Sequence, residues 1–297
     1  MSHDRHDGRH DGGLAADLPA LLGRRNLLAL LGGAGGLGLA GAPARALAAC
    51  VALPWETAGP YPADGTNSRE GQVINVLTQS GVLRDDIRSS FGNMTGTAEG
   101  VPLVLDLTLL NADGCTPLAG HAIYLWHCTA DGYYSLYTVP DQNFLRGVAV
   151  SDADGKVRFQ TIVPGCYDGR WPHIHFEIYK NAEAAVSGEA AVLTAQIAMP
   201  EAEMAALYKA DSRYAASIEN LAEITIPGDN VFGDNSAEQI AQQTLALSGD
   251  ASAGYVGTLA IPVDFTAERR APAMPPGAPP DGNPPPGPPP AGSPSNG

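Results

Sequence analysis

The chain has 297 residues, 44% of them hydrophobic, and a formal net charge of -15 at pH 7. This hydrophobic content is enough for a packed core, so we expect a folded protein and not a disordered chain. The strong negative charge disfavours nucleic acid and anionic membrane surfaces as partners, and it is typical of a soluble protein outside the cell.

The first 48 residues resemble an export signal. Arg24 and Arg25 precede a Gly/Leu/Ala stretch that runs to about Ala42, and a small-residue segment, Pro-Ala-Arg-Ala-Leu-Ala, follows it. The apolar stretch of about 16 residues is too short to favour a membrane span. We therefore predict a twin-arginine-type signal peptide over residues 1–48, no membrane span, and export to the periplasm or beyond.

The chain contains four cysteines, Cys50, Cys115, Cys128 and Cys166. Four cysteines in an exported protein predict two disulfides, and the sequence leaves all three pairings open. Their spacing does not match a Cys-x-x-Cys zinc site. An alternative for Cys50 is acylation, because Leu-Ala-Ala-Cys also fits a lipoprotein signal, and this would leave an odd thiol.

The middle of the chain predicts a mainly β domain. Residues 63–99 predict no confident element, and one clear helix is expected over 201–209, with a further helix around 237–247. Alternating and β-branched residues joined by Asp-Gly turns predict strands over 101–110, 121–128, 147–151, 156–162, 173–179, 191–197 and 254–263. This pattern favours an antiparallel β-sandwich with long loops and one or two short helices.

The end of the chain differs in composition. From residue 271 onward, 12 of 27 residues are proline and 5 are glycine. Such a segment cannot bury a core. We therefore predict one β-sandwich domain over residues 49–267 and a Pro/Gly-rich disordered tail over 268–297.

The run His-Ile-His-Phe-Glu-Ile-Tyr holds the most suggestive pair of side chains. Successive side chains of a strand point to opposite faces, so His173 and His175 should project side by side. Two imidazoles on one face suit a metal ion, but they are equally compatible with a hydrogen-bonded sheet face. A Gly-rich turn just before them holds Tyr167 and Arg170, which it could bring back towards the pair.

Several segments together resemble the intradiol ring-cleavage dioxygenases, the catechol and protocatechuate type with non-haem Fe(III). They are WHCTADGYYS, SDADG, IVPGCYDGRWPHIHFEIY and, near the start of the domain, ETAGPYP. The resemblance spans roughly residues 50–265 and is nearest to the compact exported bacterial branch.

The resemblance implies a role for each matching residue. The metal ligands would be Tyr134 and Tyr167 as phenolates and His173 and His175 as imidazoles, with Tyr133 as a substitute for Tyr134. Arg170 would stabilise negative charge on the bound substrate. Tyr167 would also act catalytically, because its phenolate can accept a proton from the substrate when it leaves the metal.

The implied reaction is the insertion of O₂ between the two oxygen-bearing carbons of a catechol, at Fe(III), to give a muconate-type diacid. The partners are then a small aromatic diol and O₂. The resemblance leaves two local questions. Trp171 could stack on the aromatic ligand or fill the edge of the sandwich, and Cys128 and Cys166 could be bridged to stiffen the loop that carries Tyr167.

Two other functions fit parts of the sequence. One is an exported, non-catalytic β-sandwich module that binds aromatic or cell-wall material. The other is a cupin or a copper/zinc protein with a His-x-His pair, which is disfavoured because the other histidines after the signal, His121 and His127, both precede the pair.

Overall fold

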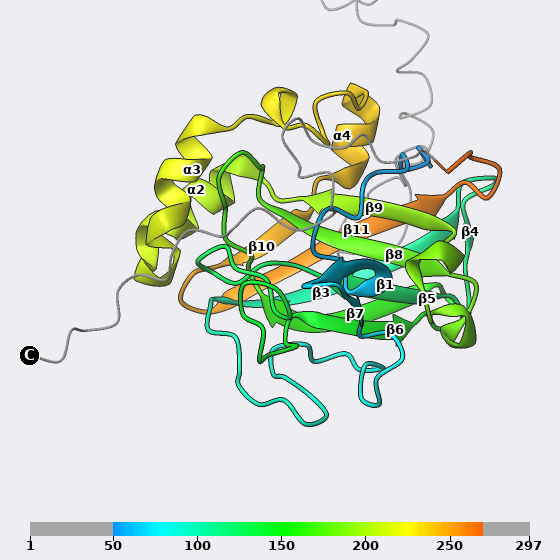
Figure 1. The fold of residues 1–297 in the computed structure, drawn as a ribbon. Helices are drawn as coiled ribbons and strands as arrows, with labels where there is room; N and C mark the ends of the chain where they lie inside the picture. Colours follow the sequence, from blue (N-terminus) through cyan, green and yellow to red (C-terminus); the bar gives the residue numbers. More distant parts are fainter. Residues whose placement is uncertain (1–49, 270–297) are drawn as a thin grey trace, which may run out of the picture. The chain divides into compact units, whose positions relative to one another are not determined.

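The computed structural model describes residues 50–269 (Figure 1). The predicted signal peptide and almost all of the predicted Pro/Gly-rich tail lie outside these residues. Within the described part of the chain, no helix is long and apolar enough to cross a membrane.

Two main β-sheets form the described domain. The first runs in the order β10 (Ala246–Asp250), β11 (Gly254–Val263), β3 (Pro102–Asn111) and β4 (Thr116–Pro117), with β7 (Lys156–Ile162) also paired to β3. The second runs in the order β6 (Arg146–Val150), β5 (Ala122–Trp126), β8 (His173–Tyr179) and β9 (Leu193–Ala198). A separate hairpin joins β1 (Asp64–Arg69) to β2 (Gln72–Asn75). The mainly β architecture predicted from the sequence is confirmed.

The principal core collects side chains from both sheets. In β3 the buried positions alternate, and Leu105 and Leu107 are among them, as expected for a strand with one face on the core. Strand β8 contributes Ile174, Phe176 and Ile178 to the same cluster. This leaves the other face of β8, which carries His173 and His175, pointing away from that core.

The outward face of the second sheet is also covered. A second buried cluster combines Tyr124 and Trp126 of β5 with Ala63 and Val76 from the start of the domain and with Tyr134 from a later loop. Every residue of β5 and β8 is therefore buried. Side chains on this face lie in a layer shielded from solvent, where polar groups need partners.

Within residues 50–269, three helices follow β9. They are α2 (Glu201–Ala210), α3 (Ala215–Glu223) and α4 (Ala237–Gln243), and Figure 1 draws them in yellow and ochre. Four 3-10 turns complete the elements: η1 (Ala182–Ala184), η2 (Gly188–Ala190), η3 (Ser212–Tyr214) and η4 (Ile226–Gly228).

The structure corrects four secondary-structure expectations. The β1–β2 hairpin lies in the segment for which no element was predicted, and α3 was not predicted. The expected helix over 237–247 ends at Gln243, because the next residues pair with β11 as strand β10. The sheets are antiparallel except that β3 and β11 run parallel. These outcomes depend on strand pairing across the fold, which local patterns do not encode.

The predicted pair of disulfides is wrong in number. Cys50 is bonded to Cys115, whereas Cys128 and Cys166 are free and buried. The possible bridge between Cys128 and Cys166 is not formed. Instead, Cys128 Sγ donates to Gly165 O and Cys166 Sγ donates to Arg170 O.

Candidate metal centre

Four side chains converge at one end of the layer that covers β8. The Nε2 atoms of His173 and His175 are 3.0 Å apart, and the phenol oxygens of Tyr167 and Tyr134 lie 3.3 and 3.5 Å from His173 Nε2. The sequence separates these residues by up to 41 positions. The structure therefore brings together all four side chains that the sequence analysis named as candidate ligands.

Strand β8 places the two imidazoles. They are two residues apart, so they share a face, and both are at most 2% exposed. His173 Nδ1 lies 2.5 Å from Trp171 O, which fixes a proton on Nδ1 and leaves the lone pair of Nε2 directed at the other donors. The His175 ring stacks on Trp126 at 4.8 Å with an interplanar angle of 4°, and this contact holds its orientation.

Two loops carry the tyrosines, and glycines let them approach. The loop with Tyr134 contains Gly132, at φ +88°, and a Cβ there would lie 3.1 Å from Tyr167 Cβ. In the loop with Tyr167, a Cβ on Gly165 would overlap with the carbonyl oxygen of Ala130. A larger residue at either position would push the two phenols apart.

The helical segment after β9 holds the loop of Tyr167. Tyr208 Oη donates to Pro164 O, and Tyr214 Oη donates to Val163 O. In α3, Ser217 Oγ accepts the N–H of Cys166 at 2.9 Å, and Asn220 Nδ2 donates to its carbonyl at 2.8 Å. The backbone on the N-terminal side of Tyr167 is therefore clamped at several consecutive polar groups.

Arg170 is held by partners from two other elements. Its Nε donates to Asp229 Oδ2 at 2.9 Å, and its Nη2 donates to Gln196 Oε1 at 2.7 Å. The Arg170 side chain is 12% exposed and the Asp229 side chain is fully buried. The guanidinium charge influences both phenols, since it favours ionisation of Tyr167 and Tyr134.

The entry segment, residues 50–62 ahead of strand β1, covers the two histidines. Gly59, at φ +70°, approaches so closely that a Cβ on it would lie 3.3 Å from His175 Cε1. The ring of Tyr61 stacks on Tyr134 at 4.6 Å. The backbone of this segment is tied to β9, because Gln196 Nε2 donates to Thr57 O. The motif ETAGPYP thus forms one wall of the site.

Burial keeps the four candidate ligands neutral when no cation is present. It lowers the pKa of His173 to about 3 and that of His175 well below its ordinary value, and neighbouring positive charge adds to both shifts. Burial also raises the pKa of Tyr167 to about 12, which Arg170 partly opposes, and it raises that of Tyr134 well above 10. At neutral pH the site therefore presents two unprotonated imidazole nitrogens and two phenols.

This donor set fits a hard, highly charged cation. The four atoms find hydrogen-bond partners mainly in one another, and two ionised phenols would supply the anionic oxygen that such a cation prefers. Within residues 50–269, no group of three or more His, Cys, Asp and Glu side chains could hold a metal. A cation here would therefore depend on the phenols, and a ferric ion is one that such donors suit.

Other candidates from the sequence lie elsewhere. Trp171 does not face the site: it is 2% exposed, packs with Ala198 and Phe232, and donates Nε1–H to Met199 O. Tyr133 is half-buried, and the ring contacts with the histidines come from Tyr134. His127 is buried and bonded to Thr161 Oγ1, whereas His121 is half-buried and lies against Phe265.

Sequence reasoning missed several residues that shape the site. Gly59 and Tyr61 stood in the motif ETAGPYP, so the resemblance contained a signal for them. Trp126 stood in WHC, but only the pairing of β5 with β8 sets it opposite His175. Gln196 and Asp229 carried no local signal that could have linked them to Arg170.

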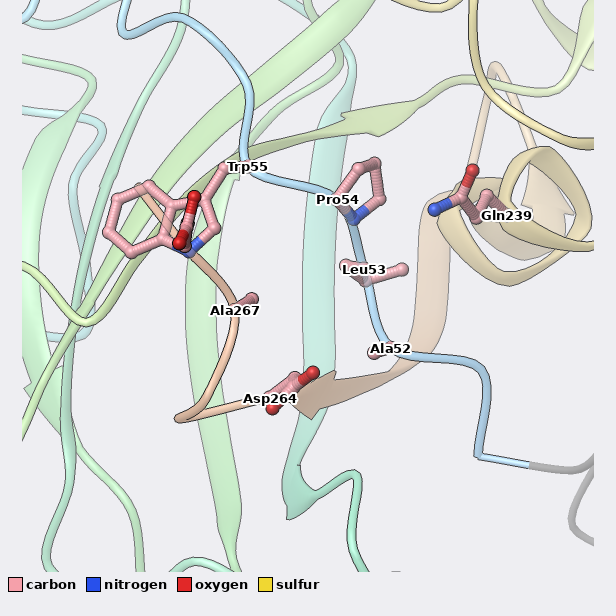
Figure 2. Close-up of a pocket in the computed structure, with 8 residues that line it drawn as sticks. Ala52, Leu53, Pro54, Trp55, Gln239, Asp264 and Ala267 are labelled. Carbon is pink, nitrogen blue, oxygen red and sulfur yellow. The ribbon is translucent and has the colours of Figure 1, made fainter. Parts of the chain in front are cut away.

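A separate pocket of about 360 Å³ lies near the start and end of the described domain. Figure 2 shows Pro54 and Trp55 on the entry segment and Gln239 on α4, with Asp264 and Ala267 beyond β11. None of the four converging side chains lines this pocket. It is therefore a different feature from the candidate metal centre.

Comparisons with known proteins find similarity to dioxygenases. Residues 83–187 match a family model described as "Dioxygenase". A stretch of 55 residues is 44% identical to chlorocatechol 1,2-dioxygenase from Rhodococcus opacus, covering 18% of this chain and 21% of that protein. Another of 98 residues is 39% identical to catechol 1,2-dioxygenase 1 from Acinetobacter lwoffii, covering 32% of this chain and 29% of that protein. The chain thus spans less than a third of the length of these two relatives.

The fold has a counterpart among solved structures. An intradiol ring-cleavage dioxygenase from Tetranychus urticae aligns over 73% of this chain and 97% of its own, with a TM-score of 0.54 and 22% identity. That likeness shows a shared fold. The segment that matches the family model, residues 83–187, holds all four candidate ligands, Tyr134, Tyr167, His173 and His175.

Proposed function

We propose that this protein is an intradiol dioxygenase that uses O₂ and non-haem Fe(III) to cleave a catechol-type ring to a muconate-type diacid. One observation carries the proposal: two phenol oxygens from separate loops and the second imidazole nitrogen of β8 all lie within 3.5 Å of His173 Nε2. Tyr134, Tyr167, His173 and His175 would hold the iron. When bound, the ion would supply Lewis-acid activation of both diol oxygens and of the ring towards O₂.

The residues of the chain would bind the diol and move its protons. Tyr167 is suited to accept a proton at Oη, because burial makes its phenolate a strong base with a pKa of about 12. Arg170 would stabilise the negative charge that the ionised diol carries. Gly59 and Tyr61 would limit the entry of water from the side of the entry segment.

Oxygen uptake tests the proposal directly. We expect the purified protein to bind iron, to show the reddish colour of phenolate-to-iron charge transfer, and to consume O₂ with at least one of catechol, hydroxyquinol and protocatechuate. Tyr167→Phe and His175→Ala should lose most of this activity, and a matched control, His121→Ala, should keep it, because His121 lies outside the site.

The rival function makes a different prediction. A non-catalytic module would be colourless, free of iron and inactive with every diol. Equal oxygen uptake by the wild type and both site variants would also exclude the proposed site. Identification of the diol depends on the relative kcat/KM values across the panel.

We also propose that the protein is exported. The support is the signal-like sequence of residues 1–48 together with the Cys50–Cys115 disulfide, which suits an oxidising compartment. Fractionation of cells that produce the full chain should recover the protein outside the cytoplasm. Replacing Arg24 and Arg25 with lysine should retain it inside.

A further inference from the structure

The guanidinium of Arg170 is only partly occupied by its partners. It has five N–H donors in a fixed plane. Nε donates to Asp229 Oδ2 at 2.9 Å, and Nη2 donates to Gln196 Oε1 at 2.7 Å and to Asp229 Oδ1 at 3.4 Å. Nη1 makes no hydrogen bond to any residue in the range 50–269. One edge of the group is thus fixed, and the other is available.

Asp229 is built to hold that edge in one place. Its carboxylate is fully buried and also accepts the backbone N–H of Trp171 at 2.7 Å, of Val231 at 2.8 Å and of Phe232 at 3.0 Å. The backbone bonds fix both oxygens before Arg170 is considered. They also stabilise the buried negative charge, because a carboxylate without hydrogen-bond partners is strongly disfavoured in the protein interior.

A second anchor comes from Gln196 of β9. It accepts from Arg170 and donates Nε2–H to Thr57 O, so it links the guanidinium to the entry segment that covers His175. The contacts of Arg170 therefore run to β9 and to the loop before α4, and both anchors are buried. A long, flexible side chain held at two points keeps little of its rotamer freedom.

We propose that Asp229 is a positioning residue of the reaction, acting through Arg170: it fixes the guanidinium so that the Nη1 edge faces the negative charge of the bound diol. This inference rests on the proposed function. Asp229 itself touches neither the candidate ligands nor the diol. It orders the guanidinium before the diol binds, and such preorganised charges lower a reaction barrier.

A double-mutant cycle separates positioning from general structure. Asp229→Asn has nearly the same shape but presents an amide to the N–H groups of Arg170 and Trp171. We expect kcat/KM to fall by about 10- to 100-fold, as for other supporting residues. In an Arg170→Ala background the same substitution should change kcat/KM by less than about 3-fold, because the group it positions is gone.

The controls address folding and the metal. Asp106→Asn breaks a bidentate carboxylate–arginine pair with Arg158 on the exposed face of β3, and it should leave kcat/KM unchanged. Asp229→Asn should retain wild-type iron content and the same visible absorption band. If it does not fold, Asp229→Glu, which keeps the charge but displaces it by one methylene, goes through the same cycle.

Three results would overturn the inference. They are an equal loss in both backgrounds, no loss in either, or a loss of iron together with activity in the single variant. A wild-type protein inactive with every diol is a different outcome, since it removes the proposed function and the inference with it.

Discussion

Strand β8 and the segment from Glu201 to Gln243 both shape the candidate metal centre, but they do so by different physics. Strand β8 contributes two of the four side chains that would bind the ion, and its period-two alternation alone sets both histidines on one face. The later segment contributes no candidate ligand. It acts by hydrogen bonds to the backbone and to Arg170 that hold other residues in position.

The later segment makes several hydrogen bonds to the loop that carries Tyr167. Side chains of Tyr208, Tyr214, Ser217 and Asn220 bond to the backbone between Val163 and Cys166. The loop between η4 and α4 adds Asp229, which binds Arg170. The comparison teaches that short stretches of sequence supply the side chains that would bind the ion. The positions of those side chains depend on contacts from several parts of the fold.

The largest expected effect tests the buried contact between this segment and the entry segment. The carboxylate of Glu56 is buried although the residue as a whole is only half-buried: Oε2 has no hydrogen-bond partner among the described residues, and Oε1 accepts from Asn235 and Gln243. Burial raises the pKa of Glu56 from 4.5 to about 7, against the opposing effect of those amides and of Arg170.

The sign of the pH dependence follows from that shift. Between pH 4.5 and about 7 the unfolded chain ionises Glu56 while the folded protein keeps it protonated, so the contribution of this group to stability falls as pH rises. Glu56→Gln should therefore match the wild type at pH 4 and exceed its free energy of unfolding by up to about 3 kcal/mol at pH 8. Denaturant unfolding at both pH values measures this, with Glu219→Gln as an exposed control. A difference independent of pH would contradict the prediction.

The next effect tests the clamp on the Tyr167 loop. Ser217→Ala removes the acceptor for the buried N–H of Cys166, and an unsatisfied buried donor costs about 1–3 kcal/mol. We expect that loss in the free energy of unfolding. Ser248→Ala is the matched control, because Ser248 is exposed and its Oγ bonds only to Val256 O, so the change should stay within about 0.5 kcal/mol. Equal losses in the two variants would show that the hydrogen bond between Ser217 and Cys166 does not stabilise the fold.

The smallest effect tests the wall over β8. Gly59 has a φ of +70° and Gly71 a φ of +77°. Replacing either with alanine puts a Cβ in this left-handed region, which costs about 1–2 kcal/mol. Only the Cβ at position 59 meets a neighbour, His175, whereas the space around position 71 is open. We expect similar losses of stability but weaker iron binding in Gly59→Ala alone, measured by competition with a chelator. Equal iron affinities would refute the close approach to His175.

The sequence named the residues of the candidate site but not the residues that hold them in place. His173 and His175 followed from alternation in one strand, and the ordered motifs implied Tyr134 and Tyr167. The resemblance named Tyr134, with Tyr133 as its substitute, and in the structure it is Tyr134 that contacts the two histidines. Asp229 was invisible because its role depends on a contact across 59 positions, and no local pattern records such a contact.

Composition and local pattern by themselves determined the mainly β class, the strands that span the core, the helix after Pro200 and the residue types that a ferric ion would require. The tertiary structure alone decided that β3 and β11 run parallel, that Cys50 pairs with Cys115, and that Arg170 is fixed by Asp229 and Gln196. The physical reason is range. Alternation, turns and propensities act over a few residues, whereas register, disulfide pairing and buried ion pairs depend on which distant segments share space once the core has closed.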